Sequence, residues 1–173
     1  MSEQKIRTKV VEAAKVRFIS HLDFMNTLTR ALRRSKLPIA FSQGYNPRPK
    51  LSFASALSVG LTSDSEYIDF ELEEKISPLS FKSRLNQELP EGIEITEVNQ
   101  VPLKTKSLMA IINVGRYLTR VEFNKEEITT KQFNDMIDDF LTQDEIKIER
   151  IRRNKSNRIV DLKPMILSLD VLG

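Results

Sequence analysis

The segment Glu66–Glu73 alternates polar and apolar side chains more regularly than any other part of the chain. The alternating residues are, in order, Tyr67, Ile68, Asp69, Phe70, Glu71 and Leu72. Successive side chains of a strand point to opposite faces, so this pattern predicts a strand with one face in water and the other on a core. A chain that contains such a strand must build a sheet and cover one side of it.

Further segments with strand or helix signals flank this strand. Alternation predicts strands over 5–13, 37–42, 51–57 and 93–101, and helical signals predict helices over 21–36 and 78–89. The first helix begins after Ser20 and carries an apolar stripe of Leu22, Met25, Leu28, Ala31 and Leu32. The order strand, helix, strand, strand, helix, strand predicts an α+β fold, namely a ferredoxin-like (split βαβ) domain within residues 1–102.

Residues 103–173 repeat part of this order. We expect an extended stretch up to Phe123, a helix over 130–141, and strands near 145–153 and 158–170. This series predicts a second, incomplete ferredoxin-like unit, either cut short or a shorter variant. Arg150, Arg152, Arg153, Lys155 and Arg158 surround Asn154 and Asn157, which predict a basic hairpin turn. This turn would either extend a binding surface or keep an exposed hairpin solvated.

The composition narrows the classes of chemistry. The chain has 173 residues, 40% hydrophobic and 29% charged, and no cysteine. Without cysteine it can supply neither a thiolate zinc site nor ligands for an iron–sulfur cluster, and its single histidine predicts no metal site. Its five glycines match no phosphate-binding spacing. We therefore expect no cofactor, no membrane span and a cytoplasmic location.

Positive charge is concentrated in one stretch. Between Phe24 and Ser63 there is no acidic residue, and the cations are Arg30, Arg33, Arg34, Lys36, Arg48 and Lys50. An unneutralised block of this length favours a polyanionic partner. The cations near the end of the first helix also have a structural explanation, because they stabilise the negative end of its dipole.

The loop from Phe41 to Phe53 belongs to this stretch. Pro47 and Pro49 push the residues before them away from helical angles, so the backbone around Arg48 is expected to be extended and stiff. Such a loop displays Tyr45, Asn46, Arg48 and Lys50 at a small entropic cost on binding. The alternative is a rigid connection whose charges are only solvated.

His21 is the single histidine, at the start of the first helix. An imidazole titrates near neutral pH, so His21 could act as a general base while Arg17, Arg48 or Lys50 stabilises phosphate charge. The alternative is a structural histidine that hydrogen-bonds to the loop after Lys50.

Several motifs together resemble one bacterial family. They are Arg17–Asp23 (RFISHLD), Ala31–Arg34 (ALRR), Leu37-Pro38, Ser42–Phe53 (SQGYNPRPKLSF) and Val160–Pro164 (VDLKP). With these motifs the chain resembles the radical SAM-linked family, whose members are bacterial domains fused behind a radical S-adenosylmethionine enzyme or separate small proteins. The resemblance implies a link to radical enzymes. Because this chain has no cysteine for a cluster, it would be the accessory part.

These observations lead to one functional prediction and two alternatives. We expect a non-enzymatic RNA-binding accessory module that works with a radical SAM enzyme or in RNA processing. The residues expected to bind RNA are Arg17, Arg33, Arg34, Tyr45, Asn46, Arg48 and Lys50. The alternatives are a protein-interaction adaptor for the radical enzyme and a metal-independent ribonuclease that uses His21.

Overall fold

The structure is a computed structural model that describes residues 2–123, 128–152 and 156–172. The chain divides into two compact units, Met1–Arg116 and Tyr117–Gly173. We call them unit 1 and unit 2 and describe each by itself. No helix within the described ranges has the length and apolar character needed to cross a membrane.

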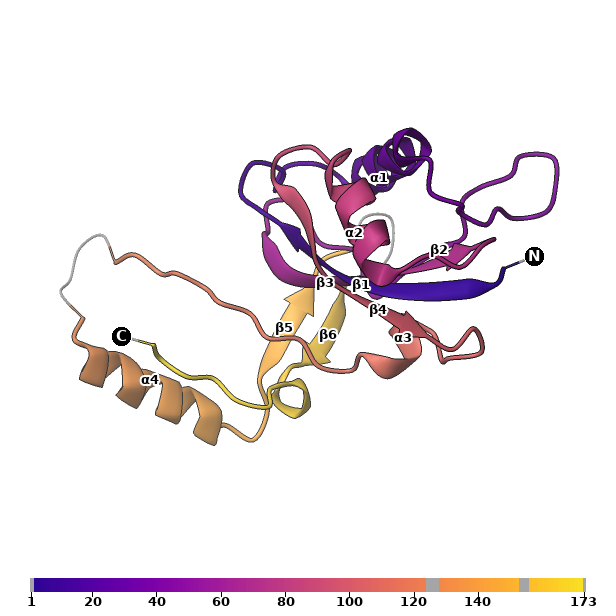
Figure 1. Cartoon of the computed structure of the whole chain (residues 1–173). Coiled ribbons are helices and arrows are strands. Elements are labelled where there is room, and N and C mark those ends of the chain that lie inside the picture. Colours follow the sequence, from indigo (N-terminus) through magenta and orange to yellow (C-terminus); the bar gives the residue numbers. More distant parts are fainter. Residues whose placement is uncertain (1, 124–127, 153–155, 173) are drawn as a thin grey trace. The chain divides into compact units, whose positions relative to one another are not determined.

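Unit 1 contains a four-stranded sheet and three helices (Figure 1). In chain order the elements are β1 Gln4–Glu12, α1 His21–Ser35, β2 Leu51–Phe53, β3 Ser63–Leu72, α2 Pro78–Asn86, β4 Ile93–Val101 and α3 Leu108–Ile111. The strands lie in the order β2-β3-β1-β4, and each neighbouring pair is antiparallel. This is the order of a split βαβ domain, so the predicted α+β, ferredoxin-like class is confirmed.

Local signals account for the helix ends. The Ser20 hydroxyl accepts from the Asp23 backbone N–H at 3.1 Å, and Lys36 closes α1 in the left-handed conformation with φ 53°. Ser77 caps α2 in the same way, with Pro78 in its first turn. Both helices begin where the sequence predicts.

The buried face of α1 differs from the predicted stripe. Leu22 was expected inside, but it is 65% exposed, whereas Phe24 is 2% exposed. The buried positions Phe24, Leu28, Ala31, Leu32 and Ser35 form one continuous helical face. Leu22 lies outside this face because it is two residues from Phe24, which places the two side chains on different sides of the helix.

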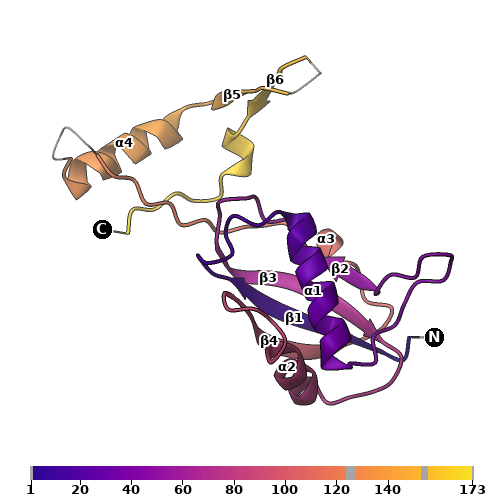
Figure 2. The same cartoon turned by 90° about the horizontal axis from the view of Figure 1, so that it is seen from above.

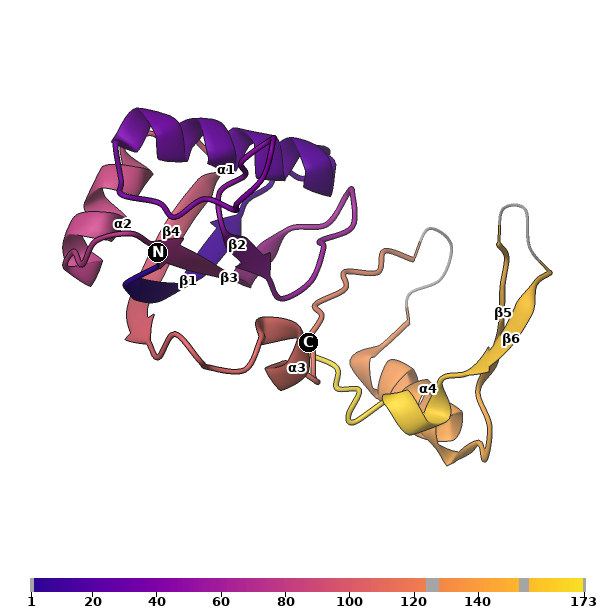
Figure 3. The ribbon, with the colours of Figure 1, turned by 90° about the vertical axis from the view of Figure 1, so that its right-hand side faces the viewer.

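The core lies between one face of the sheet and the two longer helices. Figure 2 shows α1 and α2 lying across the strands, and Figure 3 shows α3 on the opposite side of the sheet from α1. Phe70 of β3 meets Phe81 of α2 with ring centroids 5.0 Å apart, and both side chains are fully buried. The other face of the sheet carries polar side chains.

The segment 37–42 does not form the predicted strand. It makes only isolated bridges, between Ile39 and Leu72 and between Phe41 and Pro49. Proline has no N–H to donate to a ladder, so Pro38 and Pro49 limit regular pairing on both sides of the loop. Unit 1 also continues to Arg116, past the domain boundary predicted at residue 102, and includes the buried Leu108 of α3.

The described residues of unit 2 form one α-helix, one pair of antiparallel strands and a 3-10 turn. Helix α4 spans Thr130–Thr142 and begins with a capping box between Thr129 and Gln132. Strands β5 (Lys147–Arg150) and β6 (Arg158–Asp161) pair antiparallel, and a 3-10 turn follows at Lys163–Met165. The stretch before α4 was expected to be extended, but its described residues form no strand. Of the predicted hairpin turn, Arg153, Asn154 and Lys155 lie outside the described residues.

Candidate nucleic-acid interface

The loop Ser42–Pro49 is closed at its base. The Ser42 N–H donates to the Arg48 carbonyl at 2.9 Å, and the Arg48 N–H donates to the Ser42 hydroxyl at 3.0 Å. Beyond this closure, the Lys50 N–H donates to the Ala40 carbonyl at 2.8 Å. Gly44 has φ 130°, a conformation that residues with a Cβ rarely adopt. The base of the loop is therefore held closed by two hydrogen bonds, one from backbone to backbone and one to the Ser42 side chain.

The tip of this loop stands in water. The Tyr45 side chain is 101% exposed, and Asn46 and Arg48 are also exposed. Within the described ranges, Arg48 makes no ion pair with an acid. The loop thus presents an uncovered aromatic ring and, three residues further along the chain, an exposed guanidinium without an acidic partner among the described residues.

The cations at the end of α1 have different surroundings. Arg34 forms an ion pair with Glu88 at 2.8 Å, and its guanidinium also donates to the Glu88 carbonyl. Arg33 is exposed and has no acidic partner in the part of the chain that the structure describes. Arg34 is therefore used to fix α1 to the segment after α2, whereas Arg33 can reach a ligand.

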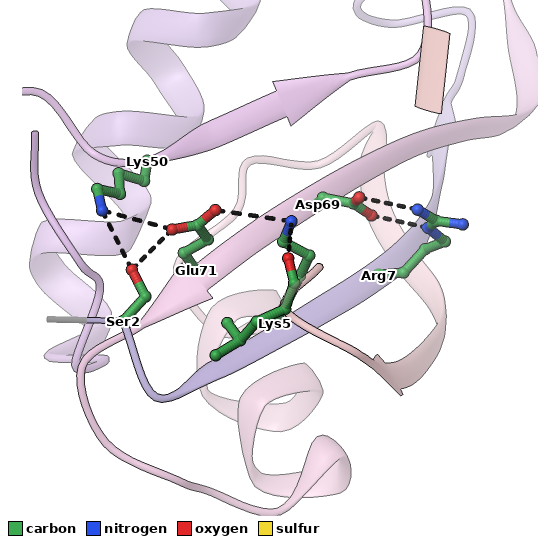
Figure 4. A network of polar contacts seen from close by, with 7 residues as sticks. Ser2, Lys5, Arg7, Lys50, Asp69 and Glu71 are labelled. Carbon is green, nitrogen blue, oxygen red and sulfur yellow. Dashed lines mark hydrogen bonds and ion pairs between the residues drawn. The ribbon is translucent and has the colours of Figure 1, made fainter. Parts of the chain in front are cut away.

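Lys50 is neutralised by an acid that is distant in sequence. Its ammonium lies 3.5 Å from Glu71 Oε2 and donates to the Ser2 hydroxyl at 3.2 Å (Figure 4). On the other side of Glu71, Lys5 Nζ lies 3.6 Å from Oε1. The Ser2 hydroxyl, and then the charges of Lys5 and Lys50, hold the pKa of Glu71 below its ordinary value. Glu71 is therefore ionised between two ammonium groups.

The charged side chains one pair of residues further along the polar face of the sheet also form an ion pair. Arg7 Nε and Nη2 donate to the two carboxylate oxygens of Asp69 at 2.8 and 2.9 Å (Figure 4). Asp69 is 3% exposed, and this hydrogen bond raises the pKa of Arg7 above its ordinary value. A bidentate pair of this kind fixes both side chains. Two residues further along β1, Lys9 Nζ lies 3.3 Å from Glu97 Oε1 on β4.

Arg17 and His21 belong to a different place. Arg17 stacks over Phe18 at 4.6 Å, and the His21 ring meets the edge of Phe53 at 5.0 Å. Both line a cavity of about 10 Å³ next to Glu12, at the far end of β1 from Lys5. Glu12 follows Lys5 by seven residues of β1, and seven residues of a strand span roughly 23 Å. Of the predicted RNA-binding residues, Arg17 therefore lies near the end of β1 that is remote from Lys5 and Glu71, whereas Arg33 and Arg34 lie at the end of α1.

The cavity also reveals a titratable residue that sequence reasoning missed. Glu12 is 7% exposed, and burial, followed by the charge of Glu66, raises its pKa to about 7. The signal was present in the alternation of β1, because Glu12 continues the inward-facing series of Ile6, Thr8 and Val10. A volume of this size accommodates about one water molecule.

The described residues include no group of three or more His, Cys, Asp or Glu side chains placed to hold a metal ion. A search of curated proteins finds no match to the chain. The profile of a family described as uncharacterized proteins conserved in bacteria (DUF2344) matches residues 5–172. The match covers nearly the entire sequence, and the chain therefore belongs to this bacterial family.

Proposed function

We propose that the protein binds single-stranded RNA through the loop Ser42–Pro49. The observation that carries this proposal is the fully exposed Tyr45 ring on a loop that is closed at its base and also carries the exposed Arg48. Aromatic rings and cations together are the usual means by which proteins hold single-stranded nucleic acid. A base stacks on the ring, and the guanidinium binds phosphate.

The closed base of the loop supports this role. Its two closing hydrogen bonds and its prolines leave few backbone conformations to lose on binding. The exposed Arg33 adds a cation without an acidic partner among the described residues. Asn46 offers an amide that can hydrogen-bond to a base edge. In this proposal, Arg34 has a structural part and Arg17 lies outside the main surface.

The chain would act as an accessory module without chemistry of its own. The motifs shared with the radical SAM-linked family support a place beside a radical enzyme that modifies or processes RNA. Lacking cysteine, this chain would deliver or position the RNA for that enzyme. The adaptor alternative uses the same residues, because Tyr and Arg are also enriched where proteins bind proteins.

Fluorescence anisotropy on labelled single-stranded RNA, measured over a range of salt concentrations, tests the proposal. Tyr45→Ala should weaken binding by about 1–3 kcal/mol at every salt concentration, because stacking is not ionic. Arg48→Ala should reduce the slope of log affinity against log salt by roughly 0.7, the value for one phosphate contact. Tyr117→Ala, which removes a tyrosine that is 81% exposed in unit 2, is the matched control.

If Tyr45→Ala and Arg48→Ala bind RNA as tightly as the wild type, the loop is not the RNA site. If the wild type binds no RNA even at low salt and binds the radical enzyme through Tyr45, the adaptor function replaces this proposal.

A second candidate function rests on the cavity beside Glu12. A carboxyl group that titrates near neutral pH lies with His21 and Arg17, and such a set can support acid–base cleavage of RNA. Cleavage of RNA that is lost in both Glu12→Gln and His21→Ala would support this ribonuclease function. Equal cleavage by the wild type and both variants would eliminate it.

A further inference from the structure

The polar face of the sheet in unit 1, part of which α3 covers, contains a hollow of about 260 Å³ next to the loop. It is lined by Lys5, Lys50, Leu51, Ser52, Asp69 and Glu71. Three neighbouring strands supply these residues, because Lys50 precedes β2, Glu71 lies on β3 and Lys5 lies on β1 (Figure 4). The pockets that hold whole small molecules are roughly 300–1,000 Å³. This hollow therefore suits a fragment such as one sugar and phosphate.

The two lysines keep unused hydrogen-bond donors. Lys5 Nζ donates to the Leu103 carbonyl at 3.0 Å, and its separation of 3.6 Å from Glu71 exceeds a hydrogen-bond distance. Lys50 Nζ donates to the Ser2 hydroxyl at 3.2 Å and lies 3.5 Å from Glu71 Oε2, which occupies two of its three donors. An ammonium has three N–H donors, so each lysine can bind a further acceptor. Both belong to the lining of one hollow, as a phosphate site requires.

The two carboxylates in the hollow differ in whether they can accept a further hydrogen bond. Both carboxylate oxygens of Asp69 accept hydrogen bonds from Arg7, which holds the Asp69 side chain in place in the lining of the hollow. Glu71 Oε2 accepts from the Ser2 hydroxyl at 2.7 Å, whereas Oε1 has only the longer contact with Lys5. An ionised carboxylate oxygen with spare capacity accepts strongly from a sugar hydroxyl. The Ser52 hydroxyl provides a further polar group in the same wall.

We propose that this hollow is the subsite for one ribonucleotide of the bound RNA. Lys5 and Lys50 hold its phosphate, and Glu71 accepts from its ribose 2′-hydroxyl. The subsite rests on the proposed RNA function and adds selectivity for RNA over DNA, because only RNA carries that hydroxyl. Lys50 connects the two sites, since it follows the loop that carries Tyr45 and Arg48.

The selectivity of binding tests the role of Glu71. We expect the wild type to prefer a single-stranded RNA to DNA of the same sequence by about tenfold, as for one hydrogen bond to a charged group. Glu71→Gln should reduce this preference while increasing DNA affinity, because the substitution removes a negative charge next to the phosphate. A carboxylate that only orders the two lysines would leave the RNA-to-DNA ratio unchanged.

The salt dependence of binding tests the two lysines. Lys5→Gln and Lys50→Gln should each reduce the salt slope by roughly 0.7. Lys5→Arg should restore the slope, because it restores the charge. Lys9→Gln is the matched control, since Lys9 lies on the same face of β1 and pairs with Glu97 outside the hollow.

Failure of the subsite can be told apart from failure of the RNA function. If Tyr45→Ala loses RNA binding but Lys5→Gln and Lys50→Gln behave like Lys9→Gln, the subsite is wrong and the RNA function stands. If the wild type binds no RNA, the subsite can be tested by itself. The protein is then titrated with uridine 5′-monophosphate and with its 2′-deoxy analogue, and binding is followed by NMR. Saturable shifts at Lys5 and Ser52 that favour the ribose form would support the subsite, and their absence would overturn it.

Discussion

Units 1 and 2 have similar local signals but different interiors. Unit 1 buries a continuous cluster from β1, β3, β4, α1 and α2. Among the described residues of unit 2, only Ile146 is buried, and α4 has no buried residue despite its amphipathic sequence. Caps and alternation therefore form helices and strands in both units, whereas a core requires elements that cover one another.

The topology explains this difference. In unit 1 two crossing helices lie on one face of four strands, so Phe70 and Phe81 can meet. In unit 2 the sheet has two strands, and an isolated two-stranded hairpin has marginal stability in water. We expect most of the free energy of unfolding to come from unit 1, and the following predictions test this comparison.

The largest expected effect is a core truncation. Leu28 of α1 is 1% exposed, so Leu28→Ala should lower the free energy of unfolding by about 2–5 kcal/mol in urea denaturation followed by circular dichroism. Met136 of α4 is 55% exposed, and Met136→Ala should change the free energy of unfolding by less than about 0.5 kcal/mol. Equal losses in the two variants would contradict the contrast between the units.

The next effect depends on pH and on a buried carboxyl group in unit 1. Because the folded pKa of Glu12 is about 7, above the ordinary value of 4.5, folding favours the protonated acid. Stability from this group is present below pH 4.5 and is lost as pH rises toward 7 and above. Each unit of pKa difference corresponds to roughly 1.4 kcal/mol, so the loss in the free energy of unfolding reaches about 3 kcal/mol.

Glu12→Gln provides the comparison, because glutamine keeps the shape and does not titrate. The difference in stability between variant and wild type should shift in favour of the variant between pH 4.5 and 8. A pH-independent difference would show that Glu12 is solvated when charged and not enclosed by the core of unit 1.

Helix caps offer a smaller test in both units. Ser20→Ala should cost about 1 kcal/mol of global stability, because α1 packs on the core of unit 1. Thr129→Ala removes the capping box of α4, so it should lower the helical signal and leave the main unfolding transition unchanged. A matching shift of that transition would show that α4 is part of the same cooperative structure.

The smallest expected effect concerns the loop Ser42–Pro49. Arg48 is exposed and makes no ion pair among the described residues, so Arg48→Ala should change stability by less than about 0.5 kcal/mol. Thermal melting of the variant provides the measurement. A drop as large as that of Ser20→Ala would show that this loop supports unit 1 instead of serving binding.

Much of unit 1 was predictable from local signals. The alternation of β1 and β3, the caps at Ser20 and Ser77, and the order of elements predicted the α+β class and the ferredoxin-like arrangement that the structure confirms. The exposed Tyr45 and Arg48 also follow from local chemistry, since two prolines and a glycine favour a loop. These features depend on neighbours within a few residues, which a sequence displays directly.

The surroundings of the charged side chains were decided by tertiary structure. The register of β1 and β3 places Glu71 between Lys5 and Lys50, although Lys50 lies in a stretch without acids. The fold also encloses Glu12 and places it beside Arg17, because strand pairing brings together residues that are far apart in the sequence. Ion pairing and burial are interactions through space, so the sequence determined which groups exist and the fold alone determined which of them remain free.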